Sequence, residues 1–135
     1  VEVGPVPCTI QRATQFHEFA WMVVGWTRQG DRAVVPPLTV QPVAAADVGE
    51  LLATIAVGPP QARSAPDFAG PQVLQLDDMA RRTMEALGDP VQIESSWDGP
   101  FGGGMTGDRL LPGPGARIGP TTFEAWLTKL REAST

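Results

Sequence analysis

A predicted core strand lies at the very start of this sequence. Residues 8–12 (Cys-Thr-Ile-Gln-Arg) have the composition of a buried strand, and only seven residues precede them. Most α/β enzymes place their nucleotide-binding loop before such a strand. Strand-like and helix-like patterns then alternate along the chain, so we expect an α/β fold, or α+β for this piece taken alone.

Composition limits what the chain can be. Its 135 residues suffice for a single domain with a modest core, and 42% hydrophobic residues with 19% charged ones favour a folded chain. A net charge of −5 without a basic stripe argues against nucleic acid. Residues 19–26 are too short an apolar run to span a bilayer, and no signal peptide is visible. We therefore expect a cytoplasmic protein with no nucleic-acid or membrane partner.

Four segments have the apolar period or the capping residues of helices. The first, residues 16–26, is apolar nearly all round, which suits a buried helix or one that needs a partner surface. Gly88 is predicted to end the third helix. The other three helices are predicted to begin at Asp47, at Asp77 or Asp78, and at Thr121.

Short strands and one long loop complete the expected layout. Residues 33–43, 73–76 and 91–94 are predicted to be extended, and the prolines of the first confine it to an edge or an irregular strand. Residues 98–120 contain eight glycines and four prolines and are predicted to form one long loop. Ordering so many glycines is unfavourable, so we expect this loop to be the most mobile internal segment, with faster amide exchange than the helix at Asp47.

Three sequence blocks resemble the atypical short-chain dehydrogenase/reductase family, the NmrA-like NAD(P)-binding proteins. They are residues 5–16, residues 41–48, and residues 69–80 followed by 87–91, in the order in which the family has them. The resemblance implies a single domain, residues 1–135, that is the C-terminal, substrate-side portion of a Rossmann-like reductase. Residues 1–57 would end the sheet with its flanking helices, and residues 58–135 would be the substrate-side region with the loop 98–120 as a lid.

The resemblance also implies site residues, because in this family the loop after the first block passes over the nicotinamide end of NAD or NADP. The matching positions near the nicotinamide are Ala13, Thr14, Gln15 and Phe16. The candidate substrate-lining residues are His17, Trp21, Trp97 and Phe101.

The chain departs from the family where catalysis and phosphate binding are concerned. It has no tyrosine and a single lysine, Lys129, so the family's Tyr-x-x-x-Lys pair cannot exist in it. No Gly-x-x-Gly-x-x-Gly turn is present to receive a pyrophosphate, and residues 102–104 do not replace it. We therefore predict no catalytic residue here and no cofactor binding by this chain alone. A front half would have to come from upstream or from another chain.

Two other functions stay open at this stage. The chain could be a non-catalytic module that binds a small apolar ligand, itself or a partner, or it could be a truncated product without activity. The apolar helix at residues 16–26 and an open strand edge lead us to expect self-association.

Individual residues also have alternative roles. No Cys/His spacing suggests a metal site, and His17 could simply begin a helix, while Cys8 is expected to be inert core packing. Ser95 and Ser96 lack a nucleophile elbow, which argues against a hydrolase. Trp97 could pack at a strand end or cover a ligand. The remaining tryptophans, Trp21, Trp26 and Trp126, are predicted to lie in the core.

Overall fold

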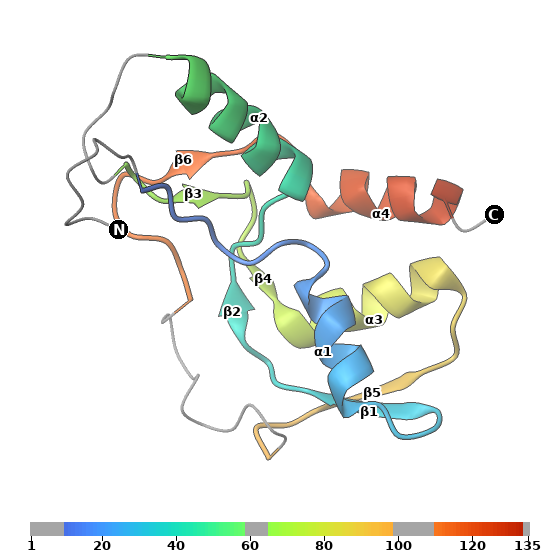
Figure 1. The fold of residues 1–135 in the computed structure, drawn as a ribbon. Coiled ribbons are helices and arrows are strands. Elements are labelled where there is room, and N and C mark those ends of the chain that lie inside the picture. The colour runs from blue at the N-terminus through green and yellow to red at the C-terminus, as the bar shows by residue number, and fades with distance from the viewer. Residues whose placement is uncertain (1–9, 59–64, 99–109, 134–135) are drawn as a thin grey trace.

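The computed structural model describes residues 10–58, 65–98 and 110–133, which combine helices with short strands (Figure 1). The helices are α1 (Phe19–Thr27), α2 (Ala45–Val57), α3 (Leu76–Leu87) and α4 (Phe123–Ala133). The strands are β1 (Arg32–Val35), β2 (Thr39–Val40), β3 (Phe68–Ala69), β4 (Leu74–Gln75), β5 (Gln92–Ser95) and β6 (Arg117–Ile118). All four predicted helices are present, and the mixture of helix and strand is consistent with the α/β class.

The strands of the described residues form three two-stranded sheets. β1 pairs with β5 and β3 with β6 in parallel, whereas β2 and β4 are antiparallel. Helices α1 and α3 pack against each other and on the β1–β5 pair, and α4 packs on α3 (Figure 1). The main hydrophobic core lies between these elements.

Residues 13–17 run extended into the middle of the molecule. Ala13 bridges Phe68 and Phe16 bridges Val43, both in parallel. The Thr14 amide donates to the Phe68 carbonyl over 2.9 Å, and the Val43 amide donates to the Gln15 carbonyl over the same distance. Because these backbone groups are used in pairing, α1 begins at Phe19 and the helix predicted for residues 16–26 starts three residues too early. The predicted strand 8–12 lies partly outside the described residues.

The capping role predicted for Asp47 is wrong. Helix α2 begins two residues earlier, and Ala44 occupies the N-cap position. The Asp47 carboxylate lies in the first helical turn and accepts hydrogen bonds from the amide and the hydroxyl of Thr121, both over 3.0 Å. This long-range contact joins α2 to the start of α4.

The starts predicted for α3 and α4 are also wrong. Thr121 is committed to Asp47, so the cap of α4 is Thr122, whose hydroxyl accepts the Ala125 amide over 3.1 Å. Helix α3 begins at Leu76, and Asp77 lies in its first turn. The predicted stop at Gly88 is confirmed, since this residue has the left-handed φ of 70° of a helix C-cap.

The region predicted as one long loop, residues 98–120, contains a strand. β6 pairs with β3, with the Arg117 amide donating to the Asp67 carbonyl and the Gly119 amide to the Ala69 carbonyl, both over 2.8 Å. Residues 99–109 lie outside the described part, so the mobility of that segment stays a prediction.

Two helices expose apolar faces to solvent. Trp21 and Trp26 were predicted to be buried but are 40% and 58% exposed, because the opposite face of α1, with Ala20, Val23 and Val24, is the one that enters the core. Among the side chains of α2 only Asp47 is buried. No helix of the described residues combines the length and the apolarity needed to cross a membrane.

Candidate functional site

Residues 13–16, the segment predicted to lie near the nicotinamide, contain two polar side chains, Thr14 and Gln15. The Thr14 hydroxyl donates to the Gln41 carbonyl over 2.6 Å and so belongs to the fold. The buried Gln15 Oε1 has no hydrogen-bond partner among the described residues. Phe16 keeps 42% of its surface exposed, and Ala13 is exposed as well. Ala13 and Phe16 are therefore the exposed members of this segment, whereas Gln15 holds a buried acceptor without a partner among the described residues.

His17 lies beneath α4 and is only 1% exposed. Its ring meets the Phe123 ring edge to face with centroids 5.7 Å apart, and the Trp126 ring at 5.8 Å. Its Nδ1 atom has no hydrogen-bond partner within the part of the chain that the structure describes. The C-terminal helix thus covers the first predicted substrate-lining residue.

Burial decides the protonation state of His17. Desolvation lowers the pKa of His17 from 6.5 to about 4, against the opposing effects of the nearby Asp47 charge and the Pro42 carbonyl. At neutral pH the ring is therefore uncharged. It has no imidazolium proton to donate, so it cannot act as a general acid there.

The other predicted substrate-lining residues do not gather around His17. Trp21 lies on the solvent face of α1, and Trp97 is partly buried against the hydrophobic core. Phe101 lies outside the described residues. The partners that His17 does have, Phe123 and Trp126, were missed as site residues: their apolar spacing predicted a helix but not the surface on which it docks.

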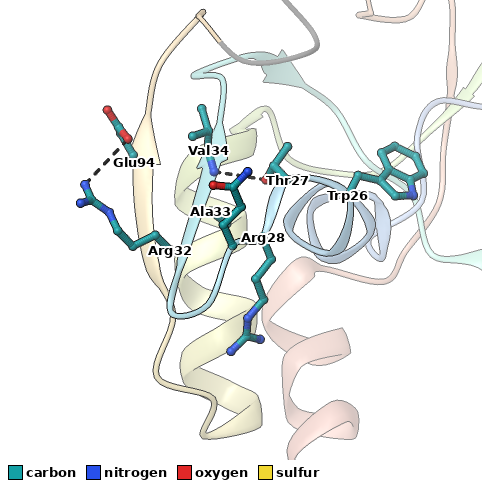
Figure 2. Close-up of a pocket in the computed structure, with 8 residues that line it drawn as sticks. Trp26, Thr27, Arg28, Arg32, Ala33, Val34 and Glu94 are labelled. Carbon is teal, nitrogen blue, oxygen red and sulfur yellow. Dashed lines mark hydrogen bonds and ion pairs between the residues drawn. The ribbon is translucent and has the colours of Figure 1, made fainter.

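A pocket of about 560 Å³ opens between the end of α1 and β1 (Figure 2). This volume is suitable for a small molecule. None of the predicted site residues lines it. Its lining residues are Trp26, Thr27, Arg28, Gln29, Arg32, Ala33, Val34 and Glu94.

The charges around this pocket are already matched. Arg28 makes two hydrogen bonds, of 2.7 and 3.0 Å, to Asp89, and these bonds raise the pKa of Arg28 and lower the pKa of Asp89. Arg32 lies 3.9 Å from Glu94, as the dashed line in Figure 2 marks. Both arginines of the lining are thus paired with a carboxylate, and the Thr27 hydroxyl is engaged by the Val23 carbonyl and the Val34 amide.

Ser95 belongs to a structural network and not to a hydrolase site. Its hydroxyl donates to Asp77 over 2.6 Å and accepts from Arg81 over 2.5 Å. The only histidine of the chain, His17, is buried under α4 instead. The network therefore joins β5 to α3.

The described residues also contain no group of three or more potential metal ligands.

The chain matches no protein-family model and no curated protein. Any assignment of function therefore depends on the sequence blocks and on the geometry described above.

Proposed function

We propose that this chain is the substrate-side portion of an NAD(P)-dependent, Rossmann-like atypical short-chain reductase and that it is inactive on its own. The observation that supports this best is the meeting of the three sequence blocks. The first block bridges the second through Phe16 and Val43. Ala13 of the first block also bridges Phe68, the residue directly before the third block. Both bridges are parallel. Parallel pairing of segments far apart in sequence is the pattern of a Rossmann-like sheet.

The second and third blocks also approach each other closely. The Gln41 side chain donates to the Gly70 carbonyl over 2.9 Å, and a Cβ on Gly70 would lie 1.7 Å from the Pro42 carbonyl oxygen. Only glycine allows this approach. The Gly-Pro pair that opens the third block thus has a physical role next to the second block.

The residues present fit one end of the cofactor only. Gln15 Oε1 has no hydrogen-bond partner among the described residues and suits the amide N–H of a nicotinamide once the side chain turns outward, since the atom is buried here. The half-exposed Phe16 ring offers an apolar surface. The sequence has no glycine-rich turn for the pyrophosphate. When bound, NAD(P) supplies or accepts a hydride.

This chain's own contribution would be to position and to shield. Gln15 and Phe16 would orient the nicotinamide end, while α4 keeps water from His17. The proton of a carbonyl reduction needs another source, since the chain has no tyrosine and His17 is neutral at pH 7. That source would be the tyrosine of the front half.

We expect the isolated chain to show neither reductase activity nor saturable binding of NADH or NADPH, because it lacks the phosphate-binding turn. Titration calorimetry measures the binding, with an intact atypical short-chain reductase as the positive control. A saturable heat signal from this chain alone would contradict the prediction.

The DNA preceding the coding region tests the ancestry itself. A reading frame, intact or shifted once, that encodes a glycine-rich βαβ unit and Tyr-x-x-x-Lys is the expected result. Unrelated DNA there would instead favour an independent module.

The exposed apolar face of α1 favours a second candidate function, a non-catalytic interaction module. Trp21, Met22 and Trp26 are each at least 40% exposed on one nine-residue helix. Exposed aromatic clusters of this kind commonly mark interfaces.

Under this second candidate, the wild-type chain self-associates and charges on the exposed face of α1 prevent it. The double variant Trp21→Asp with Met22→Asp is expected to sediment as a monomer in analytical ultracentrifugation. The control is Gln29→Asp with Gln92→Asp, which adds the same charge at exposed polar positions and should leave association unchanged. A wild-type monomer at tens of micromolar would exclude this candidate.

A further inference from the structure

We propose that α4 is a displaceable cover, docked over the neutral imidazole of His17 and released when that imidazole takes up a proton. This inference goes beyond the proposed function and does not depend on it. It concerns how the C-terminal helix responds to acid.

The contacts between His17 and α4 make the helix sensitive to the charge of the ring. Phe123 and Trp126 enclose the imidazole, and the chain leaves its Nδ1 without a partner among the described residues. A proton added to Nδ1 creates a charged N–H on a ring that is 1% exposed, at an atom that has no partner among the described residues. Such a group is strongly disfavoured until water reaches it.

Movement of α4 would uncover His17, because two of its rings contact the imidazole. Of the fourteen buried residues of the main core cluster, only Phe123 and Leu127 belong to α4. The other twelve lie on α1, β1, β2, α3 and β5 or on the connections between them, so most of this core is built by other elements, with Trp126 and Leu130 of α4 packed against it.

Polar contacts hold the start of α4 in place, and Arg131 and Glu132 near its end are engaged as well. The Gln72 side chain accepts the Phe123 amide over 3.0 Å, and Asp47 binds Thr121 just before the helix. Arg82 on α3 forms an ion pair with Glu124 and lies over the Phe123 ring. The Asp47 and Gln72 contacts lie at the start of α4, as His17 does, and Asp47 is the group among them that favours a charged ring.

Asp47 is the charged group that acts on the pKa of His17, and it opposes the effect of burial. Asp47 on α2 favours the charged ring, yet both of its carboxylate oxygens already accept hydrogen bonds from Thr121. The other charged groups on these elements are Glu18 beside His17 in the chain, Glu50 on α2, Asp77, Asp78, Arg81, Arg82 and Glu85 on α3, and Glu124, Lys129, Arg131 and Glu132 on α4.

The sign of the effect follows from the two states of the ring. In the docked state the pKa of His17 is about 4, and in an opened state it returns toward 6.5. The opened state therefore binds more protons between these values. The equilibrium constant for docking of α4 is largest above pH 6.5. It decreases as the pH falls toward 4, by a factor on the order of a few hundred.

NMR spectroscopy of the wild-type chain between pH 7.5 and 4 tests the cover directly. We expect the His17 ring and the amide protection factors of α4 to change with the same midpoint, while α3 stays protected. Loss of α3 and α4 together would mean global unfolding and would overturn the proposal. An α4 that stays protected at pH 4, or a ring that titrates near 6.5 with α4 docked, would overturn it too.

Two variants separate His17 from the carboxylates that titrate in the same range. His17→Phe keeps a flat ring but cannot take up a proton, and His17→Gln is a smaller substitute should the first not fold. Either variant is expected to keep α4 protected at a pH where the wild type has lost it. If α4 opens at the same pH in the variant, a carboxylate such as Asp47 is responsible and the proposal fails.

Discussion

Replacing Gly70 by alanine is expected to destabilise the fold by about 3 kcal/mol or more. The new Cβ would lie 1.7 Å from the Pro42 carbonyl oxygen and 3.2 Å from the Val43 Cα, both backbone atoms. That backbone cannot simply move, because the Val43 amide and carbonyl bind the Gln15 carbonyl and the His17 amide. Denaturant unfolding followed by circular dichroism measures the loss of free energy.

Gly49→Ala is the matched control for this substitution. Gly49 lies within α2, and a Cβ there would have no atom within 4 Å. Alanine in a helix interior is preferred over glycine by up to about 1 kcal/mol, so this variant should be as stable as the wild type or more stable. Equal effects of the two substitutions would show that the approach of Gly70 to Pro42 is not a constraint in solution.

Phe123→Ala is expected to lower the free energy of unfolding by about 3–5 kcal/mol, the usual range for a buried phenylalanine. Phe123 is fully buried, stacks on Trp126 with centroids 5.6 Å apart, and holds the Arg82 guanidinium 4.9 Å from its centroid. Removing the ring also uncovers His17, so the pKa of His17 should rise toward 6.5. Denaturant unfolding and an NMR titration of the imidazole measure the two effects.

Phe123→Leu serves as the comparison, because leucine keeps an apolar side chain at the same position. It should lose less than half as much stability and leave the His17 pKa low. An unchanged imidazole titration in Phe123→Ala would mean that α4 does not determine the solvation of His17.

Local patterns were sufficient to find the helices but not their ends. The helix end predicted at Gly88 is confirmed, because a left-handed glycine and the helix that it ends are neighbours in the sequence. Asp47 and Thr121 each have the residue type of a cap, yet they bind one another across the fold. A short sequence window contains no information about such a partner, and tertiary hydrogen bonds therefore displaced both predicted starts.

The candidate site was harder to predict for a related reason. The burial of His17 depends on where α4 docks, which is decided by packing against α3 and by the Gln72 and Asp47 contacts. The sequence contains the apolar spacing of α4 but not the surface it covers. Similarly, a helix that is apolar on all sides gave no indication of which face would be buried, and Trp21 and Trp26 were assigned to the wrong one.

The strand pairings have a consequence for how this chain folds. Every sheet in the described residues joins distant segments: the registers pair residue 32 with 92, residue 39 with 75, and residue 68 with 117. Contacts between such distant segments form only after large loops close, which slows folding of a chain this short. The four helices can form early, whereas the sheets must wait. During that interval the apolar helices and the unpaired strand edges are exposed together, and a chaperone or a second chain would meet its most aggregation-prone form.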